Sequence, residues 1–367
     1  RLSHRGEYRS SVTPAIAGRD VQLSTSTLLE AEEASQELVR FDAGQTGTIG
    51  PLAALLLRSE SAASSQIENL TSSARTVALA DFGEAGPPNA QLIVKNARAM
   101  QAAISLAGQL DEAAILEMHA ALLAESNPDA TGAWRRQTVW IGGTGIGPHL
   151  ADFVPPRAEL VPAAMADLIE FMARDDLPVL VQAAIAHAQF ETIHPFIDGN
   201  GRTGRALLHS LLKSKGLLHN VTVPISAGLL ADTARYFRSL TAYQQGNPED
   251  IVLLTSEAAF SGIAEARWLV NATRELLGHW RENLTVRRDA LSRTVLEELP
   301  RQPVLSVSAV EHHFQASNTA ARRALEQLEA AGIIQEFTGR KRSKLWVATR
   351  LTDLLDEFAA RAVRRTR

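Results

Sequence analysis

Apolar residues recur every three to four positions along most of the chain, which is the spacing of one buried face of an α-helix. Pro51, a residue suited to a first helical turn, precedes Leu52, Leu55 and Leu56, and we expect this helix to end near Asn69. The same spacing predicts helices at 28–40, 90–107, 111–124, 232–243, 250–268 and 271–283. The pattern therefore favours a helical bundle.

A glycine-rich loop with Gly142, Gly143, Gly145 and Gly147 interrupts the helical pattern. Two short β-prone runs, 138–141 and 153–156, flank this loop. We therefore predict a hairpin here, the one β element expected in the first 280 residues.

A helix-loop-helix joint is predicted around residues 193–205. Pro178 opens a helix whose apolar positions, among them Val181 and Ile185, follow helical spacing as far as His194. Beyond the glycines of the loop, apolar residues at helical spacing resume over 206–212.

The last part of the chain has a different composition from about residue 287. Three short helices are predicted at 289–299, 307–314 and 317–331, the third with Ser317 as its N-cap and Gly332 after its end. Two β-prone runs, 333–337 and 344–347, then flank a basic tip. This order is that of a winged helix-turn-helix domain.

Composition narrows the class of protein. With 367 residues, 45% of them hydrophobic, the chain is long enough for two or three domains with cores of their own. Its net charge of -4 argues against general polyanion binding. Without cysteine it has no disulfide, thiolate metal site or cysteine nucleophile, and we expect the cytoplasm. No apolar run approaches the roughly 20 residues of a membrane span. The chain begins at Arg1, so a removed signal peptide stays open.

The joint combines residue types that suit a phosphate. Gly199 and Gly201 allow a turn whose N–H groups face an anion, and a helix N-terminus follows. Arg202 and Arg205, three apart, can face the same ligand with planar charged forks.

Two further side chains suggest what happens to that phosphate. A lone carboxylate such as Asp198 is compatible with phosphate when Mg²⁺ lies between them. His194 can take a proton from an attacking hydroxyl. Together these groups predict nucleotidyl or phosphoryl transfer, whereas Phe196 is expected only to anchor the loop in the core.

Two competing interpretations fit less well. The run 199–204 matches G-x-G-x-x-G, but a helix rather than a strand precedes it, so a dinucleotide site is not expected. His187, Glu191 and His194 share one helix face, yet they lack the H-E-x-x-H spacing of a zinc site. We interpret His187 and Glu191 as support for the loop.

Residues 194–205 resemble the motif of the Fic family, H-x-F-x-[D/E]-G-N-G-R-x-x-R, at every fixed position. The resemblance extends over roughly residues 50–250, and the hairpin that ends at 153–156 is similar to the family's target-positioning flap. It implies transfer of AMP from ATP to a Ser, Thr or Tyr hydroxyl of a protein, with release of pyrophosphate. Related Doc-type kinases have Lys where this chain has Gly201, which favours AMP transfer over phosphorylation.

Carried over by motif position, the resemblance implies a role for each residue. His194 would be the general base and Asp198 the Mg²⁺ ligand. The bound nucleotide would be held by Gly199, Asn200, Gly201, Arg202, Gly204 and Arg205. Within that set, Arg202 would contact the β-phosphate and Arg205 the γ-phosphate.

Residues 64–69 resemble the family's inhibitory motif, [S/T]-x-x-x-E-[G/N], through Ser64, Glu68 and Asn69. We expect Ser64 and Glu68 on one face of a helix. A glutamate brought to Arg205 would form a bidentate pair and remove that guanidinium from the γ-phosphate. Because this helix precedes the core, the chain resembles the class with an N-terminal inhibitory helix, class II.

The predicted fold is mainly α, a Fic helical core with a small β-hairpin flap, plus a C-terminal winged helix-turn-helix domain of the α+β kind. The predicted divisions are an N-terminal helical region at 1–88 with the inhibitory helix at about 51–70, a catalytic core at 89–250, a helical linker at 251–286, a winged-helix domain at 287–350 and a basic helix or tail at 351–367.

The expected partner is a target protein, the chain itself included, and the expected small molecules are ATP and Mg²⁺. No membrane partner is expected, and the oligomeric state stays open, a homodimer included. DNA is a further candidate partner because the winged helix carries Arg322, Arg323, Arg340, Lys341, Arg342 and Lys344. Glu326, Glu329 and Glu336 dilute that patch. The alternative function is therefore a DNA-binding transcriptional regulator that uses the nucleotide site as a sensor.

Overall fold

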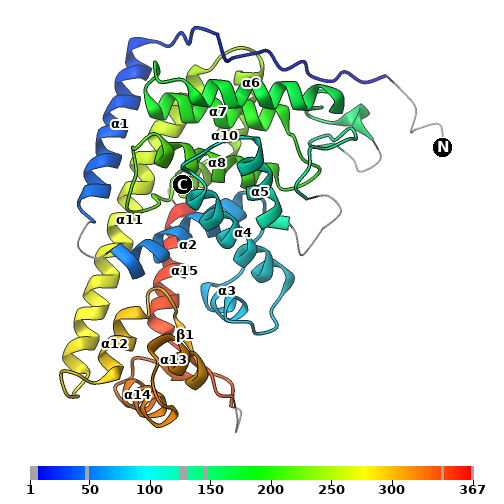
Figure 1. Ribbon diagram of the computed structural model, residues 1–367. Coiled ribbons are helices and arrows are strands. Elements are labelled where there is room, and N and C mark those ends of the chain that lie inside the picture. Colours follow the sequence, from blue (N-terminus) through cyan, green and yellow to red (C-terminus); the bar gives the residue numbers. More distant parts are fainter. Residues whose placement is uncertain (1–6, 46–48, 124–130, 144–146, 340–342, 365–367) are drawn as a thin grey trace. The chain divides into compact units, whose positions relative to one another are not determined.

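The computed structural model describes residues 7–45, 49–123, 131–143, 147–339 and 343–364 (Figure 1). Two compact units are distinguished by their internal contacts. The first comprises 1–40, 95–219 and 232–260, and the second comprises 41–94, 220–231 and 261–367. Both are mainly helical, as expected from the apolar spacing.

The first unit is built around α7 (Val179–Ile193), in which every residue from Leu180 to Ile193 is buried. α7 packs against α6 (Val161–Ala173), α8 (Asn200–Ser214) and α10 (Thr233–Gln244), and α8 also packs against α5 (Glu112–Leu123). The unit further holds the larger parts of α1 (Thr25–Ala43) and α4 (Pro88–Ser105), and the short 3₁₀ helices η3 (Pro148–Leu150) and η4 (Ala158–Leu160). Because α7 is buried on all sides, it has no separate polar face turned toward solvent.

An extended segment, the N-terminal strap (residues 8–22), crosses this unit ahead of α1. The Asp167 carboxylate on α6 accepts the backbone N–H groups of Ile16 at 2.7 Å and Ala17 at 3.1 Å. The Gln189 side chain on α7 donates to the Pro14 carbonyl at 2.8 Å. Side chains of the helices therefore make the hydrogen bonds to the strap backbone that a neighbouring strand would otherwise make.

The second unit contains α2 (Ile49–Ile67), α3 (Ala74–Asp81), α9 (Ile225–Ala231), α12 (Leu291–Glu298), α13 (Val307–Phe314), α14 (Asn318–Ala330) and α15 (Thr349–Arg364). α2 packs against α9 and α15. The buried Glu60 of α2 accepts hydrogen bonds from the backbone N–H and the hydroxyl of Ser226 in α9, so its charge is solvated inside the unit.

A small antiparallel sheet accompanies α12, α13 and α14. It consists of β1 (Val304–Leu305), β2 (Gln335–Glu336) and β3 (Trp346–Val347) in the order β1-β3-β2. Ser317 caps α14 by accepting the N–H of Ala320 at 3.3 Å, as expected from the sequence. The three helices and the β2–β3 pair occur in the order predicted from the sequence, whereas β1 was not predicted, and the winged-helix assignment stays a prediction. Arg340, Lys341 and Arg342 lie outside the described residues.

Some single elements differ in extent from their predictions. The two helices expected at 250–268 and 271–283 are one helix, α11 (Glu249–Asn283), because Leu269 and Val270 are buried between them and no residue there breaks a helix. In the part of the hairpin region that the structure describes, pairing is limited to one bridge, between Ile141 and Phe153. The sequence patterns also gave no indication of α3, α6 or α9.

The basic end of the chain also differs from expectation. From the sequence alone, Arg361 would belong to an ordinary solvated face of the predicted basic helix or tail. Instead it pairs with the buried Glu265 at 2.7 Å, and its guanidinium lies 4.4 Å from the centre of the Trp268 ring. Of the described helices, none combines the length and apolar character needed to span a bilayer.

Candidate active site

The joint between α7 and α8 is a tight turn with two left-handed residues. His194 caps α7 with φ 49° and ψ 61°, a conformation uncommon for any residue other than glycine, and Pro195 follows. Gly199, with φ 78°, precedes α8. Gly201 was expected to share this freedom but lies inside α8, and among the glycines of the motif only Gly199 has a positive φ. Helix ends on both sides thus fix the path of the loop.

The loop is anchored from within. Phe196 is fully buried, as predicted, and its ring stacks on that of His119 with centroids 3.6 Å apart. The Asn200 side chain accepts the Phe196 N–H at 2.8 Å and donates to the Phe196 carbonyl at 2.9 Å. Asn200 therefore braces the loop, a role that the sequence interpretation, which placed it on phosphate, did not include.

His119 on α5 also makes a hydrogen bond to this loop. Its Nε2 lies 3.0 Å from the Asp198 carbonyl, to which it donates. Burial lowers the pKa of His119, so the neutral ring with its hydrogen on Nε2 is favoured. A side chain at Gly199 would come within 3.0 Å of Leu122 and 3.2 Å of Leu123, so α5 leaves little room for a larger residue at a position whose positive φ already favours glycine.

Arg135 is a second support that sequence analysis missed. Its guanidinium is buried and donates to the carbonyls of His194 at 2.8 Å, Ile193 at 3.3 Å and Pro156 at 2.5 Å, and to that of Gln137 at 3.0 Å. Burial lowers the pKa of Arg135, and the carbonyl oxygens compensate its charge. Arg135 and His119 lie 59 and 79 residues from their loop partners, so no local pattern marks them.

The predicted phosphate ligands gather at the start of α8. Arg202 and Arg205 are buried, and Arg202 lies 3.6 Å from the Asp198 carboxylate, whose side chain is 62% exposed. One Asp198 oxygen accepts the Gly199 N–H at 2.6 Å. The His194 ring is 3.9 Å from the Glu191 carboxylate. An imidazole, a carboxylate and two guanidiniums therefore meet at one helix N-terminus.

Magnesium would be held by Asp198 alone among these side chains. No group of three or more His, Asp or Glu residues that could hold a metal occurs in the described parts of the chain. One exposed carboxylate fits Mg²⁺, because this ion takes its remaining ligands from phosphate oxygens and water.

Behind the arginines, α7 and α8 are in close contact. A side chain at Gly204 would come within 2.7 Å of the Glu191 carboxylate and 3.3 Å of His187 Nδ1. His187 Nε2 is 2.8 Å from the Tyr236 hydroxyl, and burial, followed by the charge of Arg205, lowers the pKa of His187 to about 3. A neutral His187 avoids a second positive charge beside Arg205.

The predicted inhibitory residues lie in the second unit. Ser64 is buried in α2, but the helix ends at Ile67, so Glu68 follows the last helical residue rather than belonging to the helix. Asn69 has φ 60°, and the Leu70 N–H bonds to the Ser65 carbonyl at 3.0 Å, which closes the helix end. Glu68 is exposed at this end.

Comparison with known proteins agrees with this geometry. Residues 109–212 match the Fic/DOC family. The chain contains a Fic domain. A crystal structure of a Fic family protein from Desulfovibrio desulfuricans G20 superimposes with a TM-score of 0.57 at 23% identity, over 89% of this chain and 97% of that one, which shows the shared fold.

Curated relatives of the Fic domain carry a named activity. The "Protein adenylyltransferase fic-1" of Caenorhabditis briggsae is 31% identical over 136 residues, which are 36% of this chain and 24% of the relative. The "Protein adenylyltransferase Fic" of Drosophila yakuba is 37% identical over 109 residues, 28% of this chain and 19% of the relative. The chain thus spans about a quarter or less of the length of these relatives.

Proposed function

We propose that this chain transfers AMP from ATP to a hydroxyl side chain of a target protein, with release of pyrophosphate. The observation that carries the proposal is the meeting of His194, Asp198, Arg202 and Arg205 at the N-terminus of α8. The relatives named protein adenylyltransferases support it.

In this proposal each group acts on one part of the reaction. His194, held by the Arg135 bond to its carbonyl, takes the proton of the attacking hydroxyl. Arg202 and Arg205 bind the β- and γ-phosphates and, with the dipole of α8, stabilise the charge on the departing pyrophosphate. Mg²⁺ bound at Asp198 would neutralise phosphate charge. Since the groups sit at fixed helix ends, alignment of the reacting atoms supplies much of the rate.

We further propose that Glu68 inhibits the reaction by pairing with Arg205. Support comes from the motif formed by Ser64, Glu68 and Asn69 and from the exposure of Glu68 at the end of α2. A carboxylate on that guanidinium would compete with the γ-phosphate and leave ATP misaligned.

Labelling of protein with α-labelled ATP tests both proposals. Glu68→Gly should raise labelling by about tenfold or more, because a loss of about 1.4 kcal/mol of competing binding is already a factor of ten. His194→Ala in the same chain should abolish labelling. Glu84→Gly, the same change in another loop of the second unit, is the matched control. Unchanged labelling by Glu68→Gly would show the inhibitory proposal to be wrong.

A second candidate function is a DNA-binding regulator that senses nucleotide. The observation that favours it is the exposure of Arg322 and Arg323 on α14, the third helix of the winged-helix order. Arg287 and Arg323 also line one hollow of about 520 Å³. Binding of DNA together with a lack of labelling by Glu68→Gly would favour this function over AMP transfer.

A further inference from the structure

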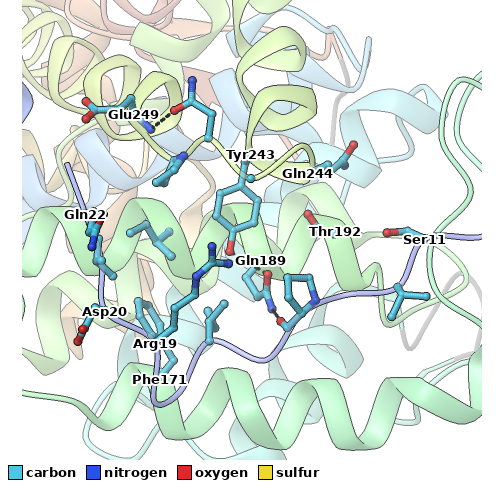
Figure 2. A pocket seen from close by; sticks show the side chains of 18 residues that line it. Ser11, Arg19, Asp20, Gln22, Phe171, Gln189, Thr192, Tyr243, Gln244 and Glu249 are labelled. Carbon is cyan, nitrogen blue, oxygen red and sulfur yellow. Dashed lines mark hydrogen bonds between the residues drawn. The ribbon is translucent and has the colours of Figure 1, made fainter. Parts of the chain in front are cut away.

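A pocket of about 540 Å³ lies in the first unit, and none of its lining residues belongs to the Fic motif (Figure 2). The N-terminal strap forms one side, α6 and α7 form the floor, and the end of α10 with the turn at 246–249 forms the other side. Its volume lies within the range of about 300–1,000 Å³ that is usual for small-molecule sites.

The floor combines apolar surface with a fixed polar network. Phe171 and Ile185 form a buried apolar base, and Val12, Pro14 and Val21 of the strap add more accessible apolar surface. The Tyr243 hydroxyl donates to the Gln189 side chain at 2.8 Å, and Gln189 in turn donates to the Pro14 carbonyl in the strap. Burial raises the pKa of Tyr243, so the phenol stays neutral and keeps this bond. These two hydrogen bonds connect the floor of the pocket to the strap.

The acidic groups near the strap are already compensated. Asp167 accepts two backbone N–H groups of the strap, and Glu249 accepts hydrogen bonds from Ser24 and Thr27. Asp20 faces Arg174, a cation paired with Asp176 at 2.6 Å. None of these carboxylates pairs with the one arginine of the strap that lines the pocket.

That cation is Arg19. Its guanidinium makes no hydrogen bond and no ion pair with any residue that the structure describes. Figure 2 shows it reaching from the strap to the hydroxyl end of Tyr243, whereas the carboxylate of Asp20 points away from the pocket. A planar fork with five donors is thus aimed into a partly apolar pocket.

We propose that this pocket binds a small organic anion. One carboxylate or phosphate group pairs with Arg19, and an apolar body lies against the apolar side chains of the strap, Val12, Pro14 and Val21. The amides of Gln22, Gln244 and Asn247 line the rim and provide donors and acceptors for a second polar group. This inference is independent of AMP transfer, because none of these residues belongs to the nucleotide site.

The chain has three tyrosines, so fluorine NMR of the 3-fluorotyrosine-labelled protein gives three signals, assigned with single Tyr→Phe variants. The probes are benzoate, phenyl phosphate and inorganic phosphate. Benzoate or phenyl phosphate should shift the Tyr243 signal saturably and leave that of Tyr236 unchanged. The tighter of the two identifies the carboxylate or the phosphate as the preferred group, and inorganic phosphate should bind about tenfold more weakly because it lacks the apolar body.

Arg19→Gln should weaken the tighter probe by about tenfold or more, whereas Arg9→Gln, an exposed arginine of the same strap, should not. The proposal is overturned if none of the three probes shifts the Tyr243 signal. It is equally overturned if Arg19→Gln binds as tightly as wild type, or if inorganic phosphate binds as tightly as phenyl phosphate.

Discussion

Arg135 shows how much one buried side chain contributes to the geometry of the loop. It spans the backbone on both sides of the α7 end, through the carbonyls of Ile193, His194 and Pro156. A single ammonium group has no fork with which to reach all of them.

Arg135→Lys should therefore lower the free energy of unfolding by about 2–3 kcal/mol, because buried carbonyls lose their donors. Urea unfolding followed by circular dichroism measures this. Arg136→Lys, the same change at the exposed neighbouring position, is the control and should lie within about 0.5 kcal/mol of wild type. Equal midpoints for the two variants would contradict the role given to Arg135.

His187 links the site to pH. Its pKa is about 3 in the folded protein, against roughly 6.5 in the unfolded chain. Below pH 6.5 the unfolded chain binds a proton that the folded protein does not. The free energy of unfolding should consequently fall as pH falls, by about 1 kcal/mol per pH unit from this residue between pH 6 and pH 4.

Unfolding of wild type and His187→Asn at pH 7, 6 and 5 measures this dependence. The variant should lose less stability than wild type over the same interval, even though its stability at pH 7 is lower. His312→Asn, at an exposed position on α13, should keep the wild-type dependence. A His187→Asn curve parallel to that of wild type would refute the assignment.

At the scale of elements, the helix caps could be predicted from the sequence, whereas the buried side chains that hold the loop in place could not. Ser317 could be predicted as the N-cap of α14 because a serine hydroxyl just before a helix can accept a free backbone N–H of its first turn. Phe196 could be placed in the core because a large apolar residue in a polar loop has few other roles. His119 and Arg135 act through tertiary contacts with backbone carbonyls, which accept from any donor and so leave no sequence pattern. The break predicted between two helices is absent from α11, because buried apolar residues continue the helix there.

α14 carries the test of nucleic-acid binding. If its exposed face contacts DNA phosphates, Arg322→Gln with Arg323→Gln should reduce the slope of log K against log salt by about 2, roughly one for each phosphate contact. Fluorescence anisotropy with a labelled duplex over 50–200 mM salt measures the slope. Arg238→Gln, at an exposed position on α10, should leave it unchanged. Identical slopes for all proteins would remove α14 from the interface.

At the scale of the whole molecule, nucleotide binding should raise the free energy of unfolding. A ligand present at about 100 times its Kd adds about 2.7 kcal/mol to a protein that binds it only when folded. ATP with Mg²⁺ should therefore raise Tm by several degrees. The rise should be larger in Glu68→Gly, where no carboxylate competes for Arg205, and smaller when EDTA removes the metal that Asp198 would hold.

Differential scanning fluorimetry of wild type, Glu68→Gly and Arg202→Gln measures these shifts. Arg202→Gln should lose most of the rise, because a buried guanidinium at the start of α8 is removed. Arg238→Gln is again the control. The nucleotide assignment is wrong if Arg202→Gln keeps the full wild-type shift.

The interleaving of the two units has a consequence for how the protein is made. Each unit draws on three separate stretches of chain, and the first is complete only when residue 260 has been synthesised. Residues 41–94 are synthesised early, but the second unit to which they belong is complete only when residue 367 has been added. A ribosome adding about 5–20 residues per second leaves these helices without their partners for many seconds. The nascent chain thus exposes apolar surface that chaperones recognise, and no cut at a single position separates the two units with both of them intact.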